Sequence, residues 1–262
     1  MIEISIDPIA FTLGSLEVRW YGIMVALGVT QVVCWMFWQV KRGAPISYNT
    51  LFTAALIGIP SAVIVSRLLH VLDRWEYFSQ HPGDIIGGSG LTIYGAILGA
   101  ALGLWIYSRV GRFQFGYFID LLAPTTILGQ AIGRVGCTIN GCCHGIPTSL
   151  PWGVIYTHPD SLAPIGVAVH PTQVYEIIFL LLLFGAIFML RNRLKPSGSL
   201  FLVYLSSYSV WRLGIGFLRQ GTDFLFGLHQ AQVIAIIVLA ITVSLLVLRT
   251  RWVRVEERVN SE

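Results

Sequence analysis

The sequence predicts an all-α membrane protein that crosses the bilayer several times. Three observations support this class: 55% of the 262 residues are hydrophobic, only 11% are charged, and the apolar residues form runs long enough to cross a bilayer. An ordinary soluble domain has roughly 25% charged residues, so the composition excludes a soluble fold. Four cysteines are too few for a secreted disulfide scaffold, and a net charge of +4 gives no reason to expect nucleic acid as a partner.

Seven apolar runs are candidate transmembrane helices, because a bilayer core requires about 20 mostly apolar residues per helix. Transmembrane strands are about half as long and alternate in polarity, which these runs do not. The runs cover residues 20–40, 51–72, 91–109, 116–135, 173–190, 198–218 and 230–248.

Basic residues predict the orientation of these helices. Alternate connections carry eleven of the seventeen Lys and Arg residues, namely Lys41, Arg42, Arg109, Arg112, Arg191, Arg193, Lys195, Arg249, Arg251, Arg254 and Arg258. The positive-inside rule places these connections in the cytoplasm. We therefore expect the N-terminus outside and the C-terminus in the cytoplasm, and no basic segment suggests a cleavable signal peptide. We expect a single transmembrane domain over residues 1–262, with a long external loop around residues 137–172.

The other six basic residues are all arginine and lie at or near the external half of the predicted membrane: Arg19, Arg67, Arg74, Arg134, Arg212 and Arg219. A charge at mid-bilayer costs at least about 2.5–3.5 kcal/mol, so such residues normally have partners. Two interpretations remain open. The arginines reach the head groups or pair with Asp73, Glu176 or Asp223, or several converge on one phosphate, whose oxygens match the guanidinium fork. Tyr21 lies on the same side.

Two further patterns favour structural roles. Asp120 is a lone carboxylate near the cytoplasmic start of the fourth run, and we interpret it as a hydrogen-bond acceptor. Gly95, Gly99 and Gly103 recur every four residues, which is typical of close packing between membrane helices.

Three cysteines gather in the segment C-T-I-N-G-C-C-H, at Cys137, Cys142 and Cys143. Their spacing is not that of a zinc site, which pairs C-x2-C with a second pair elsewhere, so we expect no metal. A disulfide or inert thiols, a reactive thiol and a metal site are the alternatives.

Six further segments occur in order along the chain: R-W-Y-G (19–22), S-R-L-L (66–69), L-T-I-Y-G-A-I-L-G (91–99), G-R-V-G-C-T-I-N-G (133–141), H-P-T-Q-V-Y-E (170–176) and W-R-L-G-I-G-F-L-R (211–219). Together they span nearly the whole chain and resemble the prolipoprotein diacylglyceryl transferase family.

The resemblance implies an enzyme of the bacterial inner membrane without a cofactor. It would move the diacylglyceryl group of phosphatidylglycerol onto the thiol of a lipobox cysteine in a prolipoprotein and release glycerol phosphate. Arg134 and Arg212 match the family's arginines and would hold the phosphate and stabilise developing charge. Tyr94 is the third catalytic candidate. The candidate substrate-binding residues, from the resemblance and the external polar set together, are Tyr21, Arg67, Arg134, Asn140, Gly145, Glu176 and Arg219.

The sequence departs from the family's usual residues at four positions. Tyr94 stands where histidine is usual, Cys137 where asparagine is usual, and Cys142 and Gly216 where glutamate is usual. If the histidine is a required base, tyrosine is a poor substitute, because its unperturbed pKa is about 10. The chain is thus also consistent with a divergent member that uses another thiol acceptor.

Two functions of other classes compete with this one. A membrane thiol oxidoreductase would use the cysteines, although no C-x-x-C pair is present and the arginines would have no role. A non-catalytic lipid-binding protein or transporter would need polar positions across the whole membrane, whereas here they gather on one side.

Overall fold

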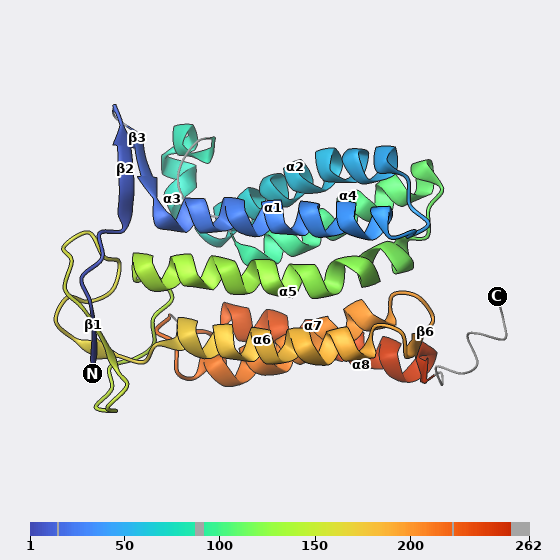
Figure 1. Ribbon diagram of the computed structural model, residues 1–262. Helices are drawn as coiled ribbons and strands as arrows, with labels where there is room; N and C mark the ends of the chain where they lie inside the picture. The colour runs from blue at the N-terminus through green and yellow to red at the C-terminus, as the bar shows by residue number, and fades with distance from the viewer. Residues whose placement is uncertain (15, 87–91, 222, 253–262) are drawn as a thin grey trace. The chain divides into compact units, whose positions relative to one another are not determined.

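The computed structural model describes residues 1–252 except residues 15, 87–91 and 222. Helices occupy all seven predicted runs (Figure 1). The helices are α1 (Trp20–Lys41), α2 (Tyr48–Asp73), α3 (Trp75–Gln80), α4 (Ile93–Gly111), α5 (Phe115–Asn140), α6 (Thr172–Leu190), α7 (Ser199–Gly216) and α8 (Gln230–Arg249), with a short 3-10 helix η1 (Pro82–Ile85).

The helices confirm an all-α membrane protein. Among the described residues, α1, α2, α5, α6 and α8 are long and apolar enough to cross a bilayer, and Gly95–Gly111 of α4 is apolar but shorter. The remaining long helix, α7, contains Arg212 and four serines, which lower its hydropathy.

Contacts divide the chain into two compact units, and each is described by itself. The first unit comprises Met1–Trp35 and Ile119–Glu262, and the second comprises Met36–Phe118.

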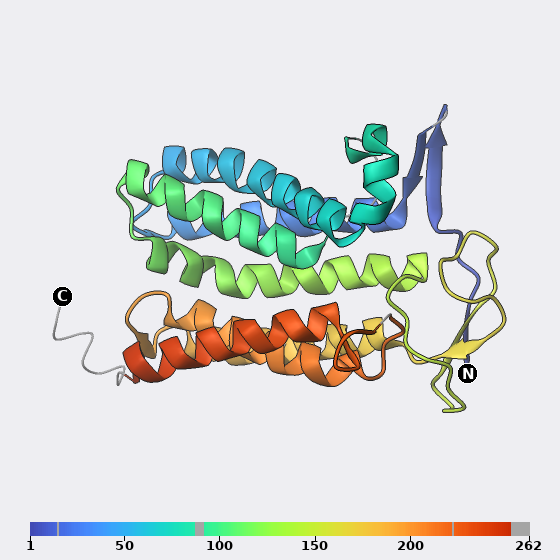
Figure 2. The same ribbon diagram turned by 180° about the vertical axis from the view of Figure 1, so that it is seen from behind.

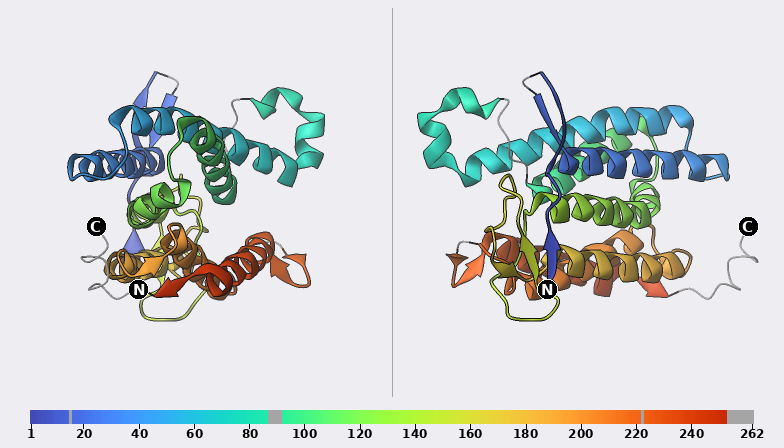
Figure 3. Two further views of the ribbon diagram at one scale, coloured as in Figure 1. Left: turned by 90° about the vertical axis from the view of Figure 1, so that its right-hand side faces the viewer. Right: turned by 60° about the vertical axis from the view of Figure 1, so that its left-hand side comes forward.

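In the second unit, α2 packs against α4 through the predicted glycine stripe (Figure 3). A Cβ atom on Gly95 would lie 2.5 Å from the Cα atom of Ser66, and one on Gly99 would overlap the Ser61 carbonyl. Gly103 faces the Ser61 side chain in the same way. The interpretation of this stripe as a close-packing surface is confirmed.

The core of the first unit lies where α5, α6 and α7 meet. Ile127 from α5, Leu180 and Ile187 from α6, and Tyr204 from α7 are completely buried there. Helix α8 runs alongside α7 (Figure 2).

Asp120 has the structural role that the sequence predicts. Its two carboxylate oxygens accept hydrogen bonds from the backbone N–H groups of Gly198 and Phe201, at 2.7 and 2.9 Å. A carboxylate there satisfies donors at the start of α7, which otherwise have no partner within the helix.

The connection after α5 is more ordered than an irregular loop. Helix α5 continues to Asn140, so Cys137 lies on its last turns, and β4 of the connection pairs in parallel with β1 at the N-terminus. This pairing joins residues 152 positions apart in sequence, such as Ile2 and Val154, which local patterns do not reveal. The strands are β1 (Ile2–Ile4), β2 (Ile9–Leu13), β3 (Leu16–Arg19), β4 (Val154–Tyr156), β5 (Ala168–Val169), β6 (Leu194–Lys195), β7 (Asp223–Leu225), β8 (Leu228–His229) and β9 (Arg251–Trp252).

Candidate functional site

A buried carboxylate joins three helices of the first unit. Glu176, in the second turn of α6, is 1% exposed, and its Oε1 atom lies 3.0 Å from Nη2 of Arg134 on α5. The same oxygen accepts a 2.9 Å hydrogen bond from the hydroxyl of Tyr208 on α7. Oε2 lies 3.9 Å from Nη1 of Arg219, just beyond the end of α7. Glu176 therefore holds two arginines from different parts of the sequence.

The pairing interpretation is correct for Arg134, whose burial makes the partner necessary. Arg134 is only 8% exposed. Breaking a buried ion pair by removing one member costs about 3–5 kcal/mol, because the other charge is left uncompensated. Glu176 therefore fixes the Arg134 side chain in place.

Arg212 lies in the same electrostatic environment, but no ion pair of its side chain is found among the described residues. It interacts electrostatically with Arg219, Glu176 and Arg134. Its Nη1 atom is buried and has no hydrogen-bond partner among the residues that the structure describes. Three guanidinium groups against one carboxylate leave a net charge of +2 on this group of four residues. Since buried donors are normally satisfied, the arrangement favours an anionic ligand.

Arg212 and Arg219 open onto a cleft of about 180 Å³ in the first unit. Its lining residues are Arg212, Gly216, Arg219, Gln220, Gly221, His229, Gln230, Ala231 and Gln232. The cleft gives a ligand access to these two arginines, whereas Arg134 and Glu176 are not among its lining residues.

Gly145 controls the position of Arg219. The two residues form an antiparallel bridge, and the Gly145 N–H donates to the carbonyl of His170 at 2.9 Å. A Cβ atom at position 145 would lie 2.5 Å from the carbonyl oxygen of Leu218 and 2.6 Å from Cβ of His170. Only glycine fits there, so Gly145 positions the arginine segment.

Gln232 explains why glycine occupies position 216. A Cβ atom on Gly216 would lie 2.5 Å from both Cδ and Nε2 of Gln232. Gln232 is itself buried and held by two hydrogen bonds, donating to the Leu213 carbonyl and accepting from the His229 N–H. In this chain the glutamine side chain fills space that a glutamate at position 216 would require.

Two further candidates lie near the N-terminal segment. The Asn140 side chain is buried, and its Oδ1 atom accepts from Nη1 of Arg19 at 3.4 Å. Arg19 also lies 3.7 Å from Glu17. Tyr21 lies in the first turn of α1, is 42% exposed, and interacts electrostatically with Arg134.

Two candidates belong to the second unit. Arg67 donates to the backbone carbonyls of Asp84 and Ile85 and lies over the Phe78 ring. Tyr94 is in the first turn of α4, and its side chain lies outside the described residues, as do the side chains of Asp73 and Asp223, which the sequence analysis considered as partners.

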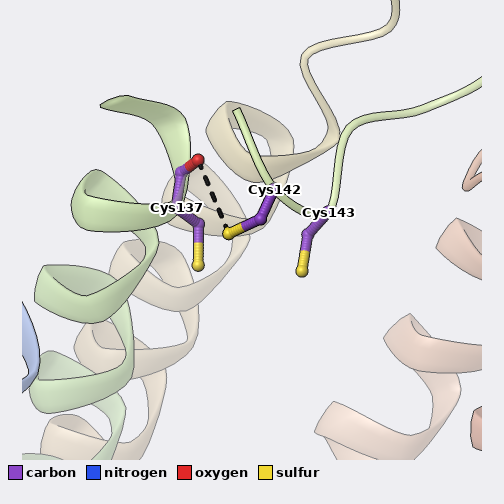
Figure 4. A group of neighbouring side chains, drawn as sticks. All are labelled: Cys137, Cys142 and Cys143. Atoms are coloured by element: carbon purple, nitrogen blue, oxygen red, sulfur yellow. Dashed lines mark hydrogen bonds between the residues drawn. The ribbon is translucent and has the colours of Figure 1, made fainter. Parts of the chain in front are cut away.

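The three clustered cysteines are brought together at the end of α5 (Figure 4). All are free thiols, as is the exposed Cys34. Hydrogen bonding by the Cys137 and Cys142 thiols lowers the pKa of Cys143, and Arg219 and Arg134 act in the same direction against the effect of burial. The arrangement of these groups therefore favours the ionised form of Cys143 over that of its two neighbours.

Sequence reasoning missed Tyr208 and Gln232. Tyr208 precedes Arg212 by four residues and so shares its helix face, a signal that could have indicated a role. Gln232 is in the first turn of α8, and no pattern in the sequence links it to Gly216.

The fold and the site define a class: an α-helical membrane protein with a buried, positively charged arginine site. Comparison with known proteins identifies a family within this class. Residues 8–248 match the family described as prolipoprotein diacylglyceryl transferase, and the chain belongs to this family. The resemblance inferred from the six segments is thus confirmed.

Several curated relatives carry the name phosphatidylglycerol–prolipoprotein diacylglyceryl transferase. The protein of Dehalococcoides mccartyi is 56% identical over 251 residues, which cover 96% of each chain. The protein of Clostridioides difficile is 34% identical over 88% of this chain and 90% of its own length. That of Clostridium tetani is 34% identical over 81% of this chain and 85% of its own length.

Proposed function

We propose that this chain transfers the diacylglyceryl group of phosphatidylglycerol to prolipoproteins. Relatives that match nearly its whole length carry this activity in their name. The structural observation that carries the proposal is the buried Nη1 of Arg212, which has no hydrogen-bond partner within the described residues and belongs to a site of net charge +2. A phosphodiester supplies both the negative charge and the acceptor oxygens.

The arginines would bind the lipid phosphate and stabilise the departing group. The thiolate of a lipobox cysteine in the acceptor attacks the glycerol carbon that bears the phosphate, and the bond from that carbon to oxygen breaks. Glycerol phosphate leaves with the electron pair of that bond, so negative charge develops on its oxygen. Preorganised donors aimed at developing charge lower the barrier. Arg212 and Arg219 reach the cleft, and Arg134, held by Glu176, adds its positive charge to the same site.

The proposal extends to the other candidate residues. Gly145 positions Arg219, and Asn140 lies at the end of α5 with Arg19. We assign contacts with the lipid head group to Tyr21 and Arg67. We assign a catalytic role to Tyr94, which stands where histidine is usual in the family.

We also propose that the chain is one transmembrane domain of seven spans in the bacterial inner membrane, with the pocket facing the outer leaflet. The distribution of basic residues supports this orientation. Single cysteines placed at Glu17 and Asp223 should react with a membrane-impermeant thiol reagent in intact cells, and one at Lys195 should react only after permeabilisation. The background is a chain without its natural cysteines. Labelling of position 195 in intact cells would contradict the orientation.

The activity is tested with the purified full chain in detergent micelles containing phosphatidylglycerol and a lipobox peptide. We expect release of glycerol phosphate and a peptide whose mass increases by one diacylglyceryl group. The Arg109→Lys variant, changed at the end of α4, is the control and should be as active as the natural chain. The expression of this chain should also restore growth to a bacterium depleted of its own transferase. Failure of both tests with folded protein would refute the proposal.

A further inference from the structure

The cysteine cluster lies beside the arginine site, and diacylglyceryl transfer assigns it no role. Cys137 is on α5, and Cys142 and Cys143 are in the turn that follows this helix. The three Sγ atoms all lie within 4.8 Å of one another. Figure 4 shows the Cys142 sulfur directed toward Cys137, with the Cys143 sulfur alongside.

The turn is held in place by hydrogen bonds from α6. The Thr172 hydroxyl donates to the Cys143 carbonyl at 2.6 Å, and Nε2 of Gln173 donates to the Cys142 carbonyl at 2.8 Å. Both α6 residues are buried. Cys143 has a φ of 64°, a left-handed conformation that is uncommon for residues other than glycine. The protein therefore stabilises an unfavourable backbone conformation that brings the third thiol to the other two.

We propose that Cys137, Cys142 and Cys143 bind one thiophilic divalent cation of the Zn²⁺ type. Thiolates are the ligands that such cations prefer. With metal–sulfur bonds of about 2.3 Å, three sulfurs around one ion are separated by about 4.0 Å, which is compatible with the observed cluster.

The charge balance is favourable. One divalent cation and three thiolates give a complex with one negative charge, and each thiol that is still protonated releases its proton when the ion binds. Nη1 of Arg134 lies 3.8 Å from the Cys137 sulfur and compensates this charge. Three protein ligands leave a fourth coordination position open for water or another small donor.

The sequence spacing argued against this site because C-x4-C-C contains no C-x2-C pair. The structure supplies the third ligand differently, since the last turn of α5 and the left-handed turn at Cys143 direct the sulfurs to one place. The inference does not depend on the proposed transfer reaction.

Cobalt binding tests the proposal directly, because Co²⁺ replaces Zn²⁺ and its thiolate complexes absorb through sulfur-to-metal charge transfer. The full chain is purified in detergent micelles, reduced, freed of reductant and titrated with Co²⁺ and then with Zn²⁺. We expect one Co²⁺ per chain, a charge-transfer band, and loss of this band when Zn²⁺ displaces Co²⁺. Protons should be released into a weakly buffered solution during the titration.

Variants locate the site. Cys143→Ser should weaken Co²⁺ binding by more than the roughly 10–100-fold that loss of an outer-shell contact causes, and Cys142→Ser should do the same. Cys34→Ser is the matched control, because Cys34 is exposed on α1 outside the cluster, and it should bind Co²⁺ normally. Arg212→Met should also bind normally even if transfer activity is lost, which separates this proposal from the proposed function.

Two results would overturn the proposal. One is the absence of a charge-transfer band in the natural chain when it is fully reduced and a thermal unfolding transition shows that it is folded. The other is a band of equal strength in both serine variants. Formation of an internal disulfide under air, with no metal binding before oxidation, would assign the cluster to redox chemistry instead.

Discussion

Replacing Arg212 with methionine should separate stability from function in this protein. Arg212 is half-buried, and its buried Nη1 atom has no hydrogen-bond partner in the described part of the chain. It also lies in the field of two other arginines, Arg219 and Arg134. The methionine keeps much of the side-chain length and removes one of the like charges. Desolvation of a charge opposes folding, and Arg212 is also repelled by the two other arginines, so the methionine variant should be at least as stable as the natural chain.

The same change should lower the transfer activity. Loss of one preorganised donor to developing negative charge typically lowers turnover about 10²–10³-fold, or about 2.7–4 kcal/mol. Arg212→Lys should lose most of the activity as well, since an ammonium keeps the charge but lacks the planar fork that binds phosphate oxygens in pairs.

Arg134→Met is the comparison variant for stability. It removes the partner 3.0 Å from the buried Glu176, so it should destabilise the protein by about 3–5 kcal/mol. The measurements are thermal unfolding in detergent and glycerol phosphate release from phosphatidylglycerol. If Arg212→Met unfolds at as low a temperature as Arg134→Met, or retains full activity, the assignment of Arg212 as a ligand-binding cation is wrong.

Three other changes test the surrounding structure. Gly216→Glu should lower the unfolding temperature and the activity, because its Cβ would lie 2.5 Å from Gln232. Adding Gln232→Ala should restore part of both. If the double variant is as unstable and as inactive as Gly216→Glu alone, a clash with Gln232 is not the cause. Gly145→Ala would place a Cβ 2.5 Å from the Leu218 carbonyl oxygen and should raise the KM for phosphatidylglycerol by displacing Arg219. An unchanged KM would show that Arg219 keeps its position in this variant. The lowered pKa of Cys143 keeps its thiolate populated as pH falls, so alkylation of Cys143 by iodoacetamide, followed by mass spectrometry, should still proceed at about pH 7, below the ordinary thiol pKa of about 8.5. A rate that falls tenfold per pH unit below that value would be evidence against this thiolate.

The membrane class and the helices follow from the sequence alone because they depend on local composition. Apolar runs long enough for the bilayer predict where the helices lie, and the structure places a helix in every run. Two further predictions also depend on the sequence alone. The glycine stripe from Gly95 to Gly103 packs closely against α2, and Asp120 accepts hydrogen bonds at the start of α7.

The site itself depends on partners that are distant in sequence. The sequence leaves open whether Arg134 pairs with a carboxylate or binds phosphate, because both uses require the same buried arginine. Only the tertiary structure shows that Glu176 pairs with Arg134, and that a buried nitrogen of Arg212 has no hydrogen-bond partner among the described residues.

The same distinction applies to the departures from the family pattern. In the sequence, Gly216 is a departure from the glutamate that is usual in the family. In the structure, Gln232 of another helix occupies the space that a side chain at position 216 would need. The spacing of Cys137 and Cys143 predicts no metal site, yet the left-handed turn brings their sulfurs together. Hydrophobic runs are properties of neighbouring residues and can be found along the chain, whereas ion pairs, filled spaces and thiol clusters arise only when packing brings separate segments within a few ångströms.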